Sequence, residues 1–201
     1  CTSGLHEARL AHEEYRREDG SGEVHVFSAA FSEPHLKELL TFADHIVFNS
    51  CSQWQRFAPL LAKARQRRPG LQFGLRINPE HSEGTVPLYD PCAPGSRLGT
   101  TLDTLDESCL EGISGLHFHT LCEQDFEPLE RILAVVEEKF GHLLPRMEWV
   151  NFGGGHHITR PDYQVDRLVA CIRRFSRQYG VQVYLEPGEA RRPTLTWPRQ
   201  I

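Results

Sequence analysis

The sequence feature that most constrains the fold of this chain is an alternation of short apolar runs with longer amphipathic stretches. Six runs rich in Val, Ile, Leu and Phe recur along the chain. They occupy residues 23–29, 45–50, 72–77, 115–120, 148–153 and 181–186. Short, nearly continuous apolar runs are typical of strands buried on both faces of a sheet. We therefore predict a strand at each of them.

The segments between these runs have the periodicity and the end signals of helices. They cover residues 6–18, 32–43, 52–67, 126–141 and 162–180. Ser32 is an expected N-cap, Ser50 or Ser52 is another, and Gly180 is an expected helix end. Strands that alternate with helices predict βα units around a parallel sheet. On the residues alone, a (β/α)8 barrel and a doubly wound sheet both fit this order.

Two stretches fit none of these elements. Residues 79–99 form a long segment rich in Pro, Gly and Ser directly after the third apolar run. A loop of that length is usually either functional or disordered. Residues 191–201 contain two prolines and are predicted to be a tail outside a domain of residues 1–190.

Composition places the chain among ordinary globular proteins, with 39% hydrophobic and 24% charged residues. The net charge of −5, with arginines spread along the chain, argues against a nucleic-acid partner. No apolar run approaches the ~20 residues of a membrane span, and we expect no leader peptide and no membrane partner. The six cysteines form no CxxC pair, so we expect reduced thiols and a cytoplasmic location.

Parallel α/β folds place their functional groups at the carboxyl ends of the strands. One apolar run ends in His117 and His119, which alternate along a strand and should point to the same side. Three interpretations fit this pair: a ring stacked on a flat cofactor, an HxH metal site, or hydrogen-bonded histidines of the core.

A triple glycine, Gly153 to Gly155, follows the next apolar run. Glycine lets an anion come close to backbone N–H groups, so phosphate binding is one interpretation. A flexible turn is the other.

Two charged residues stand at further strand ends. Glu186 closes the last run before a Pro-Gly turn, where it could pair with a protonated ring nitrogen, act as an acid or base, or cap a helix. Arg76 lies near the end of an earlier run. Its guanidinium could hold a phosphate, a carboxylate or an imidazole, or form a surface ion pair.

Taken in order, the motifs LRINP, GLHFHTLCE, FGGGHH and LEPGEA resemble the fold-III pyridoxal-phosphate-dependent decarboxylases. This family is built on an alanine racemase-like (β/α)8 barrel. HFHTLCE, YDPCAPGSRLG, NFGGGHH and EPGEA are most similar to its carboxynorspermidine (carboxyspermidine) branch. The resemblance covers residues 1–190. It implies decarboxylation of a polyamine precursor with pyridoxal 5′-phosphate as the cofactor, and a homodimer.

The resemblance also implies roles for individual residues. His119 would stack on the pyridine ring, Glu186 would keep the ring nitrogen protonated, and Arg76 would support His119 from behind. Further cofactor contacts are implied for Gly153, Gly154, Gly155 and Gly188. Substrate contacts are implied for His156 and Glu189.

Two departures from the family pattern shape the expectation for this chain. Glu189 stands where many relatives have arginine, which fits the carboxynorspermidine branch. The Schiff-base lysine of the family would lie upstream of residue 1, and the lysines present are Lys37, Lys63 and Lys139, all in helical segments. We therefore expect a barrel truncated at both ends, without its first strand and its C-terminal β-domain, and no turnover by this chain alone.

Two functions of other classes are also open. One is a non-catalytic pseudoenzyme or fragment that pairs with an intact relative. The other is a metal-dependent barrel hydrolase that uses His117 and His119 as ligands.

Overall fold

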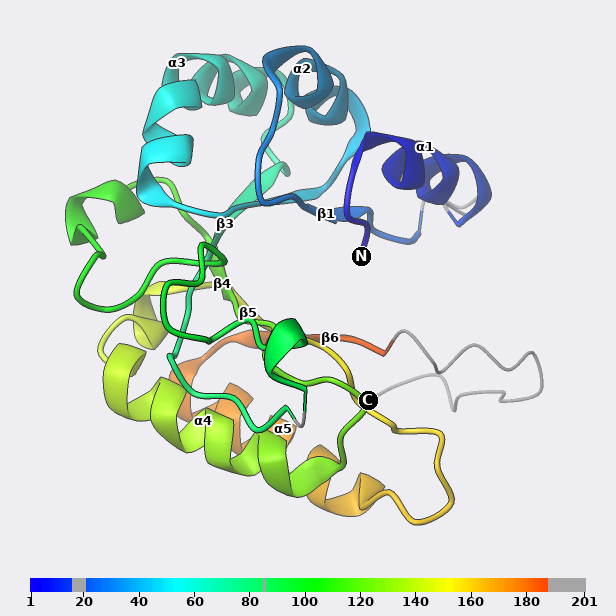
Figure 1. Ribbon diagram of the computed structural model, residues 1–201. Helices are drawn as coiled ribbons and strands as arrows, with labels where there is room; N and C mark the ends of the chain where they lie inside the picture. Colours follow the sequence, from blue (N-terminus) through cyan, green and yellow to red (C-terminus); the bar gives the residue numbers. More distant parts are fainter. Residues whose placement is uncertain (16–20, 85, 188–201) are drawn as a thin grey trace.

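Six parallel strands form one sheet in chain order (Figure 1). The structure is a computed structural model that describes residues 1–15, 21–84 and 86–187. The strands are β1 (His25–Phe27), β2 (His45–Phe48), β3 (Gln72–Arg76), β4 (Gly115–His117), β5 (Trp149–Gly154) and β6 (Gln182–Glu186). Each predicted strand is therefore confirmed, although β1 and β4 are shorter than the runs that predicted them.

The predicted helices are also present in the described part of the chain. They are α1 (Leu5–Glu14), α2 (Glu33–Phe42), α3 (Cys51–Arg67), α4 (Phe126–Phe140) and α5 (Val165–Tyr179). The first ends before its predicted limit, and residues 16–18 of that prediction lie outside the described residues. Among the described residues, no helix has the length and apolar character needed to cross a bilayer.

Local signals fix where these helices begin and end. The Ser32 hydroxyl accepts a hydrogen bond from the N–H of His35 at 3.4 Å, and the Ser50 hydroxyl accepts one from Gln53 at 3.3 Å. Each bond satisfies an N–H group that the first turn of a helix leaves without a partner. Gly180 ends α5 with φ 71°, a left-handed conformation that suits glycine.

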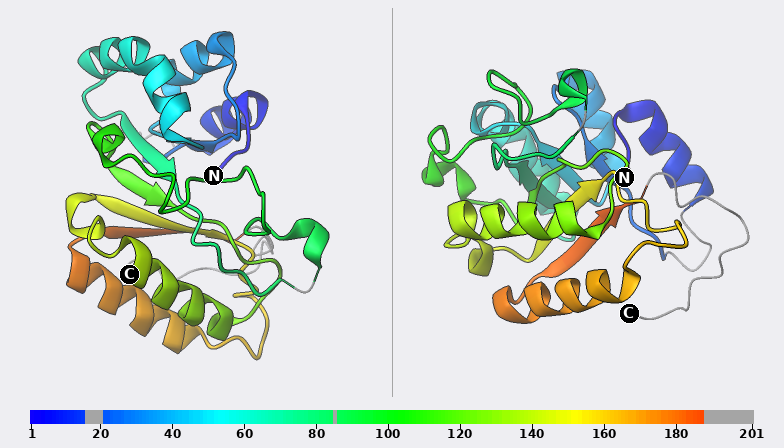
Figure 2. Two further views of the ribbon diagram at one scale, coloured as in Figure 1. Left: turned by 60° about the vertical axis from the view of Figure 1, so that its left-hand side comes forward. Right: turned by 60° about the horizontal axis from the view of Figure 1, so that its bottom comes forward.

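The sheet curls, and the helices lie on its outer side (Figures 1 and 2). The curl brings the first and last strands close together. A hydrogen bond shows this closeness: the Tyr184 hydroxyl on β6 donates to Glu23, just before β1, at 3.0 Å. A doubly wound sheet would carry helices on both faces. The fold is therefore an incomplete (β/α)8 barrel, and the doubly wound alternative is wrong.

The outer edge of β1 is partly covered by the N-terminal segment. Thr2 pairs in parallel with Val26: its N–H donates to the carbonyl of His25 at 2.9 Å, and its carbonyl accepts from Phe27 at 3.0 Å. This segment stands where the strand before β1 would lie, and it brings residues 1–3 to the carboxyl ends of the strands.

Histidines and aromatic rings fill the barrel interior at the amino ends of the strands. The rings of His25 and His45 stack with their centroids 3.9 Å apart, and Trp149 and Tyr184 pack against His45. Burial, together with the neighbouring His25, lowers the pKa of His45 to about 4. His45 is therefore a neutral core side chain at neutral pH.

The long connection between β3 and β4 is folded against the barrel instead of carrying an α-helix. It contains two short 3-10 helices, η1 (Pro87–Tyr89) and η2 (Glu107–Leu110). The Asn78 amide donates to the carbonyls of Pro91 and Leu98, at 3.3 and 3.0 Å. These bonds hold the segment 89–98 over the carboxyl ends of the strands, so the functional interpretation of this long loop gains support.

Two of the six cysteines are bonded to each other. A disulfide joins Cys51, at the start of α3, to Cys109 in η2. The expectation of reduced thiols is therefore wrong for this pair, and the bond ties the outer helix to the segment that precedes β4. The other four are free: Cys1, Cys92, Cys122 and Cys171.

Replacing Cys109 with serine is expected to lower the free energy of unfolding by about 4 kcal/mol. The bond closes a loop between residues 58 apart, and the value follows from the loop-closure entropy of that length. Urea unfolding at pH 7 measures the loss. Cys171→Ser, at a half-buried free thiol, is the matched control. Identical unfolding of the wild type with and without reductant would contradict the prediction.

Candidate functional site

A cavity of about 450 Å³ opens at the carboxyl ends of the strands. Phe27, Arg76, His119 and Glu186 line it from four different strands or strand ends. The segment 89–98 contributes further lining residues. Residues predicted from separate motifs therefore meet in one place.

The Glu186 carboxylate is the charged group at the centre of this site. Its Oε1 accepts a hydrogen bond from the Asn151 amide at 2.8 Å and lies 3.5 Å from Nε2 of His117. Its Oε2 lies 3.6 Å from Nδ1 of His119. Burial alone would raise the pKa of Glu186, but the two histidines beside the carboxyl lower it to about 2. The carboxylate is therefore ionised at neutral pH.

The two histidines of the HxH motif share a side of the sheet, as predicted, but differ in environment. The His117 side chain is 1% exposed, whereas that of His119 is 40% exposed at the cavity mouth. Burial lowers the pKa of His117 to about 3, so this imidazole is neutral. The burial of His117 fits the core interpretation, but neither of its ring nitrogens has a hydrogen-bond partner among the described residues. The exposed ring of His119 fits a surface that is available to a ligand.

The same three side chains also have the composition of a metal site. One ligand atom each from His117, His119 and Glu186 lies within 4.8 Å of the other two. Two imidazoles and a carboxylate are ligands that Zn²⁺ accepts in catalytic sites. The metal interpretation of the HxH pair thus has a geometric basis here.

Arg76 supports His119 through the peptide backbone. Its guanidinium donates to the carbonyl of His119 at 3.2 Å and lies over the ring of Phe27, 4.6 Å from the centroid. The side chain is buried in the wall of the cavity. Arg76 therefore stands behind His119, as the resemblance implies, but it holds the peptide and not the imidazole.

The triple glycine, called the glycine turn below, comprises the last two residues of β5 and the residue after it, and it has no room for side chains. Gly153 and Gly155 have φ angles of 73° and 82°. A Cβ atom would lie 2.4 Å from the Phe118 carbonyl oxygen at Gly153, and 2.3 Å from that of Leu121 at Gly155. The turn therefore packs directly on the backbone that follows β4, beside His119.

Two N–H groups of this turn are already engaged within the protein. The N–H of Gly153 donates to Oδ1 of Asn151 at 2.8 Å, and that of Gly154 donates to Nδ1 of His119 at a longer 3.4 Å. A phosphate would therefore compete with His119 for the Gly154 N–H. The sequence predicts glycine amides that face an anion, but it cannot reveal these internal acceptors.

Of the remaining predicted contacts, His156 is described by the structure and is not brought to the cavity. His156 is 2% exposed and lies beside the Phe152 and Gly153 carbonyls, and burial lowers its pKa to about 4. It stands behind the turn and does not line the cavity. Gly188 and Glu189 lie outside the described residues.

The lysines are placed on the outer helices, as the sequence predicts. Lys37 pairs with Glu33 on α2 at 2.7 Å, and Lys139 of α4 pairs with Glu80 at 2.8 Å. Lys63 lies on α3. The described part of the cavity wall contains none of the three.

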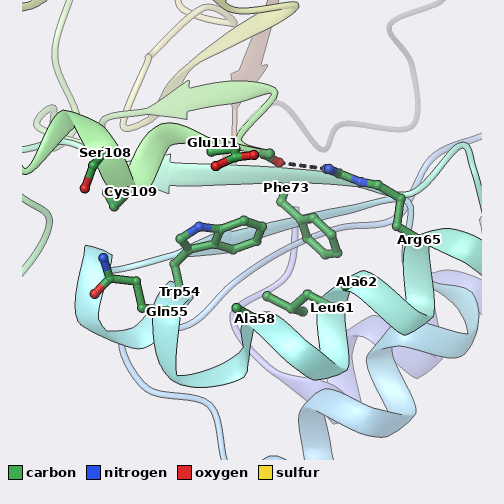
Figure 3. A pocket seen from close by; sticks show the side chains of 11 residues that line it. Trp54, Gln55, Ala58, Leu61, Ala62, Arg65, Phe73, Ser108, Cys109 and Glu111 are labelled. Carbon is green, nitrogen blue, oxygen red and sulfur yellow. Dashed lines mark hydrogen bonds between the residues drawn. The ribbon is translucent and has the colours of Figure 1, made fainter.

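A second cavity, of about 390 Å³, lies on the outer side of the sheet between α3 and residues 108–112 (Figure 3). Trp54 and Phe73 form its floor, and the Arg65 guanidinium crosses it to donate to the Gly112 carbonyl at 2.7 Å. It contains none of the strand-end residues predicted to be functional. We therefore place the candidate functional site at the carboxyl ends of the strands.

The parallel barrel is similar in fold to a class of solved structures, the decarboxylases. Diaminopimelate decarboxylase from Helicobacter pylori, complexed with L-lysine, is similar with a TM-score of 0.69 over 92% of this chain and 50% of that one. At 15% identity, that likeness concerns the fold alone.

Within this class the chain is similar to the carboxynorspermidine/carboxyspermidine decarboxylases, which confirms the resemblance seen in the sequence. The protein of this name from Campylobacter jejuni is 46% identical over 191 residues, and that from Herminiimonas arsenicoxydans is 38% identical. A carboxyaminopropylagmatine decarboxylase from Synechocystis is 40% identical.

A crystal structure of carboxynorspermidine decarboxylase from Campylobacter jejuni, complexed with norspermidine, is similar with a TM-score of 0.75 and 43% identity. It matches 94% of this chain and 45% of its own. The chain likewise spans 46% to 49% of the length of the three curated relatives. No protein-family model matches the chain.

Proposed function

We propose that this chain carries part of the active site of a pyridoxal-phosphate-dependent decarboxylase that acts on carboxynorspermidine or carboxyspermidine in polyamine biosynthesis. The curated relatives at 46% and 38% identity support the substrate class. The observation that carries the proposal is the half-buried carboxylate of Glu186 at the mouth of the barrel, beside His119 and hydrogen-bonded to Asn151.

Glu186 is the proposed partner of the pyridine nitrogen. Bound pyridoxal phosphate supplies an electron sink for the charge that decarboxylation leaves on the substrate α-carbon. An anionic carboxylate favours a protonated nitrogen, because opposite charges stabilise each other's ionised form. The low pKa of Glu186 keeps the carboxyl as an acceptor, so a proton shared with the ring nitrogen would reside on that nitrogen.

His119 and the glycine turn are the proposed contacts with the rest of the cofactor. The exposed imidazole of His119 would lie against the ring face, and the hydrogen bond from Arg76 fixes the peptide of His119. Gly153, Gly154 and Gly155 are the proposed phosphate contacts, because glycine lets backbone N–H groups come close to an anion. The N–H of Gly154 would exchange Nδ1 of His119 for the phosphate.

Gly188 and Glu189 remain proposed contacts of the cofactor and the substrate. Glu189 follows Pro187 and Gly188 in the sequence after β6, and a carboxylate at this position could bind a cationic amine group of the substrate. His156 also remains a proposed substrate contact, although from its buried position it would need the glycine turn to move.

We also propose a homodimer and a cytoplasmic location. The homodimer follows from the family resemblance, and the location from a substrate that is an intermediate of metabolism. The Cys51–Cys109 bond weighs against a reducing compartment, where disulfides rarely persist. Alkylation of free thiols in freshly lysed cells, followed by mass analysis, tests the location through the redox state of this pair.

Replacing Glu186 with glutamine is expected to weaken the binding of pyridoxine 5′-phosphate about 10- to 100-fold, the cost of losing one charge-assisted hydrogen bond. This ligand has no aldehyde, so it binds without forming a bond to lysine. Fluorescence titration of the purified chain measures the dissociation constant. Glu23→Gln, at the opposite end of the barrel, is the matched control. Equal affinities of Glu186→Gln and the wild type would contradict the role of Glu186.

The chain alone is expected to show no decarboxylase turnover. Lys37, Lys63 and Lys139 lie on the outer helices, so none of them reaches the cavity. An assay of carbon dioxide release from carboxynorspermidine tests this, and turnover above background would contradict it. Co-purification with an intact relative would favour the pseudoenzyme alternative.

A metal-dependent hydrolase is the second candidate, favoured by the convergence of His117, His119 and Glu186. Metal analysis of the purified chain separates the two functions. Stoichiometric zinc that is lost in Glu186→Gln would favour the hydrolase.

A further inference from the structure

The strand that leads into the glycine turn departs from regular pairing with its neighbour. Asn151 is opposite Tyr184, but Gly154 is opposite Glu186, so three steps along β5 face two steps along β6. Such a bulge leaves one residue without its ladder partner and bends the strand. The extra step lies between the strand interior and the turn, next to Glu186.

The Asn151 side chain forms hydrogen bonds across this irregular stretch. Its Oδ1 accepts the N–H of Gly153 at 2.8 Å, and its Nδ2 donates to Oε1 of Glu186 at 2.8 Å. The side chain is buried, with 1% of the residue exposed. A third, longer contact joins Nδ2 to Sγ of Cys1 at 3.6 Å. One carboxamide thus connects the glycine turn to the acid of the site.

We propose that Asn151 is a positioning residue of the cofactor pocket, which fixes Glu186 with its amide nitrogen and the glycine turn with its amide oxygen. The inference rests on the proposed function, and it gives a role to the first residue of the NFGGGHH motif, to which the sequence assigned none. The proposed ring-nitrogen partner and the proposed phosphate-binding turn are then held in one geometry by a single side chain.

Among the described residues, Asn151 forms the shortest polar contact of the Glu186 side chain, a hydrogen bond of 2.8 Å. The imidazole nitrogens of His117 and His119 lie at 3.5 and 3.6 Å from the carboxylate, beyond a good hydrogen bond. The bond occupies Oε1 and leaves Oε2 directed to the side of His119 and the cavity. A buried carboxylate that accepts a hydrogen bond is stabilised in its ionised form.

Only a carboxamide serves both ends of this arrangement. Asn151→Asp retains an oxygen for the N–H of Gly153 but places a second carboxylate against Glu186. Two adjacent buried carboxylates share one proton, and one of them acquires a raised pKa. Asn151→Leu has a similar volume and removes both hydrogen bonds. The two variants therefore separate the two ends of the proposed role.

The first measurement uses the ligand-free chain. Carbon-13 NMR of a chain with labelled glutamate carboxyl groups follows the titration of Glu186, which is assigned with Glu186→Gln. Asn151→Leu is expected to raise the pKa of Glu186 by about one unit or more, and Asn151→Asp by more than Asn151→Leu. Asn49 is the matched control, because its buried amide also bridges two backbone groups, the Arg97 carbonyl and the Gly99 N–H.

An unchanged titration of Glu186 in Asn151→Leu would overturn the inference, as would an equal shift in Asn49→Leu. If Asn151→Leu fails to fold, Asn151→Asp alone decides, because its shared proton must appear as a new titration of the Glu186 signal. Absence of that titration in folded Asn151→Asp overturns the inference as well.

The second measurement adds pyridoxine 5′-phosphate and follows the absorbance of its ring against pH. Asn151→Asp is expected to lower the affinity about 10-fold and to add an ionisation to the pH profile, whereas Asn49→Asp leaves the profile unchanged. Failure of the wild type to bind this ligand while the NMR shifts are present would refute the proposed function and support the inference. Wild-type binding with identical pH profiles for wild type and Asn151→Asp would refute the inference.

Discussion

Replacing Gly155 with alanine is expected to destabilise the fold by more than about 3 kcal/mol. Its φ of 82° already disfavours any side chain, at a cost of about 1 to 2 kcal/mol. A Cβ atom there would also lie 2.3 and 2.4 Å from the carbonyl oxygen and carbon of Leu121. These are backbone atoms, so no rotamer change relieves the overlap. Urea unfolding at pH 7 measures the loss.

Gly180 provides a control with the same backbone conformation and open surroundings. Its φ is 71°, and a Cβ atom there would meet nothing within 4 Å. Gly180→Ala is therefore expected to lose only the conformational part, about 1 kcal/mol. Equal losses in the two variants would mean that the turn yields without cost and would contradict the close packing described for it.

Lowering the pH from 7 to 4.5 is expected to destabilise the chain by several kcal/mol. Burial lowers the pKa values of His45, His117 and His156 to about 4, 3 and 4. An unfolded histidine titrates near pH 6.5, so below that pH the unfolded state binds more protons than the folded state. Stability therefore falls from about pH 6.5 toward 4, by up to about 3 kcal/mol for one such residue.

Glu186 does not contribute to the loss of stability between pH 7 and pH 4.5. The lowered pKa of Glu186 contributes stability above the unfolded value of 4.5, and that contribution is lost only as the pH falls toward 2. Urea unfolding at several pH values between 7.5 and 4.5 tests the histidine prediction. His156→Gln should reduce the pH dependence, and His142→Gln, at an exposed histidine, should leave it unchanged. A flat stability profile across this range would refute the prediction.

The sequence predicts the barrel well because its strands are apolar on both faces and its helices carry clear end signals. Ser32 and Gly180, for example, cap the helices that they were expected to cap. We also predicted functional groups at the carboxyl ends of the strands, and His119, Glu186 and Arg76 do line one cavity there. This prediction works because parallel strands all end at the same edge of the sheet, so residues at strand ends lie close together whatever their separation in the sequence.

What the sequence could not predict depends on contacts between distant residues or on irregular backbone. The Cys51–Cys109 pair is separated by 58 residues, and only the fold brings the two thiols together. The register shift in β5 and the burial of His156, which does not line the cavity, are not visible in the sequence either. Asn151 on β5 lies directly opposite His117 on β4. No local signal in the sequence shows that the Asn151 amide forms a hydrogen bond with Glu186.

Arg76 holds the peptide of His119 and leaves the imidazole without a restraint from the guanidinium. The ring nitrogen of His119 is at the same time the acceptor for the Gly154 N–H and the neighbour of Glu186 Oε2. A rotation about the side-chain bonds of His119 would therefore expose an amide donor and a carboxylate oxygen in one movement. Entry of a ligand with an anionic end and a cationic end would need only that one torsional change, while the barrel wall stays as it is.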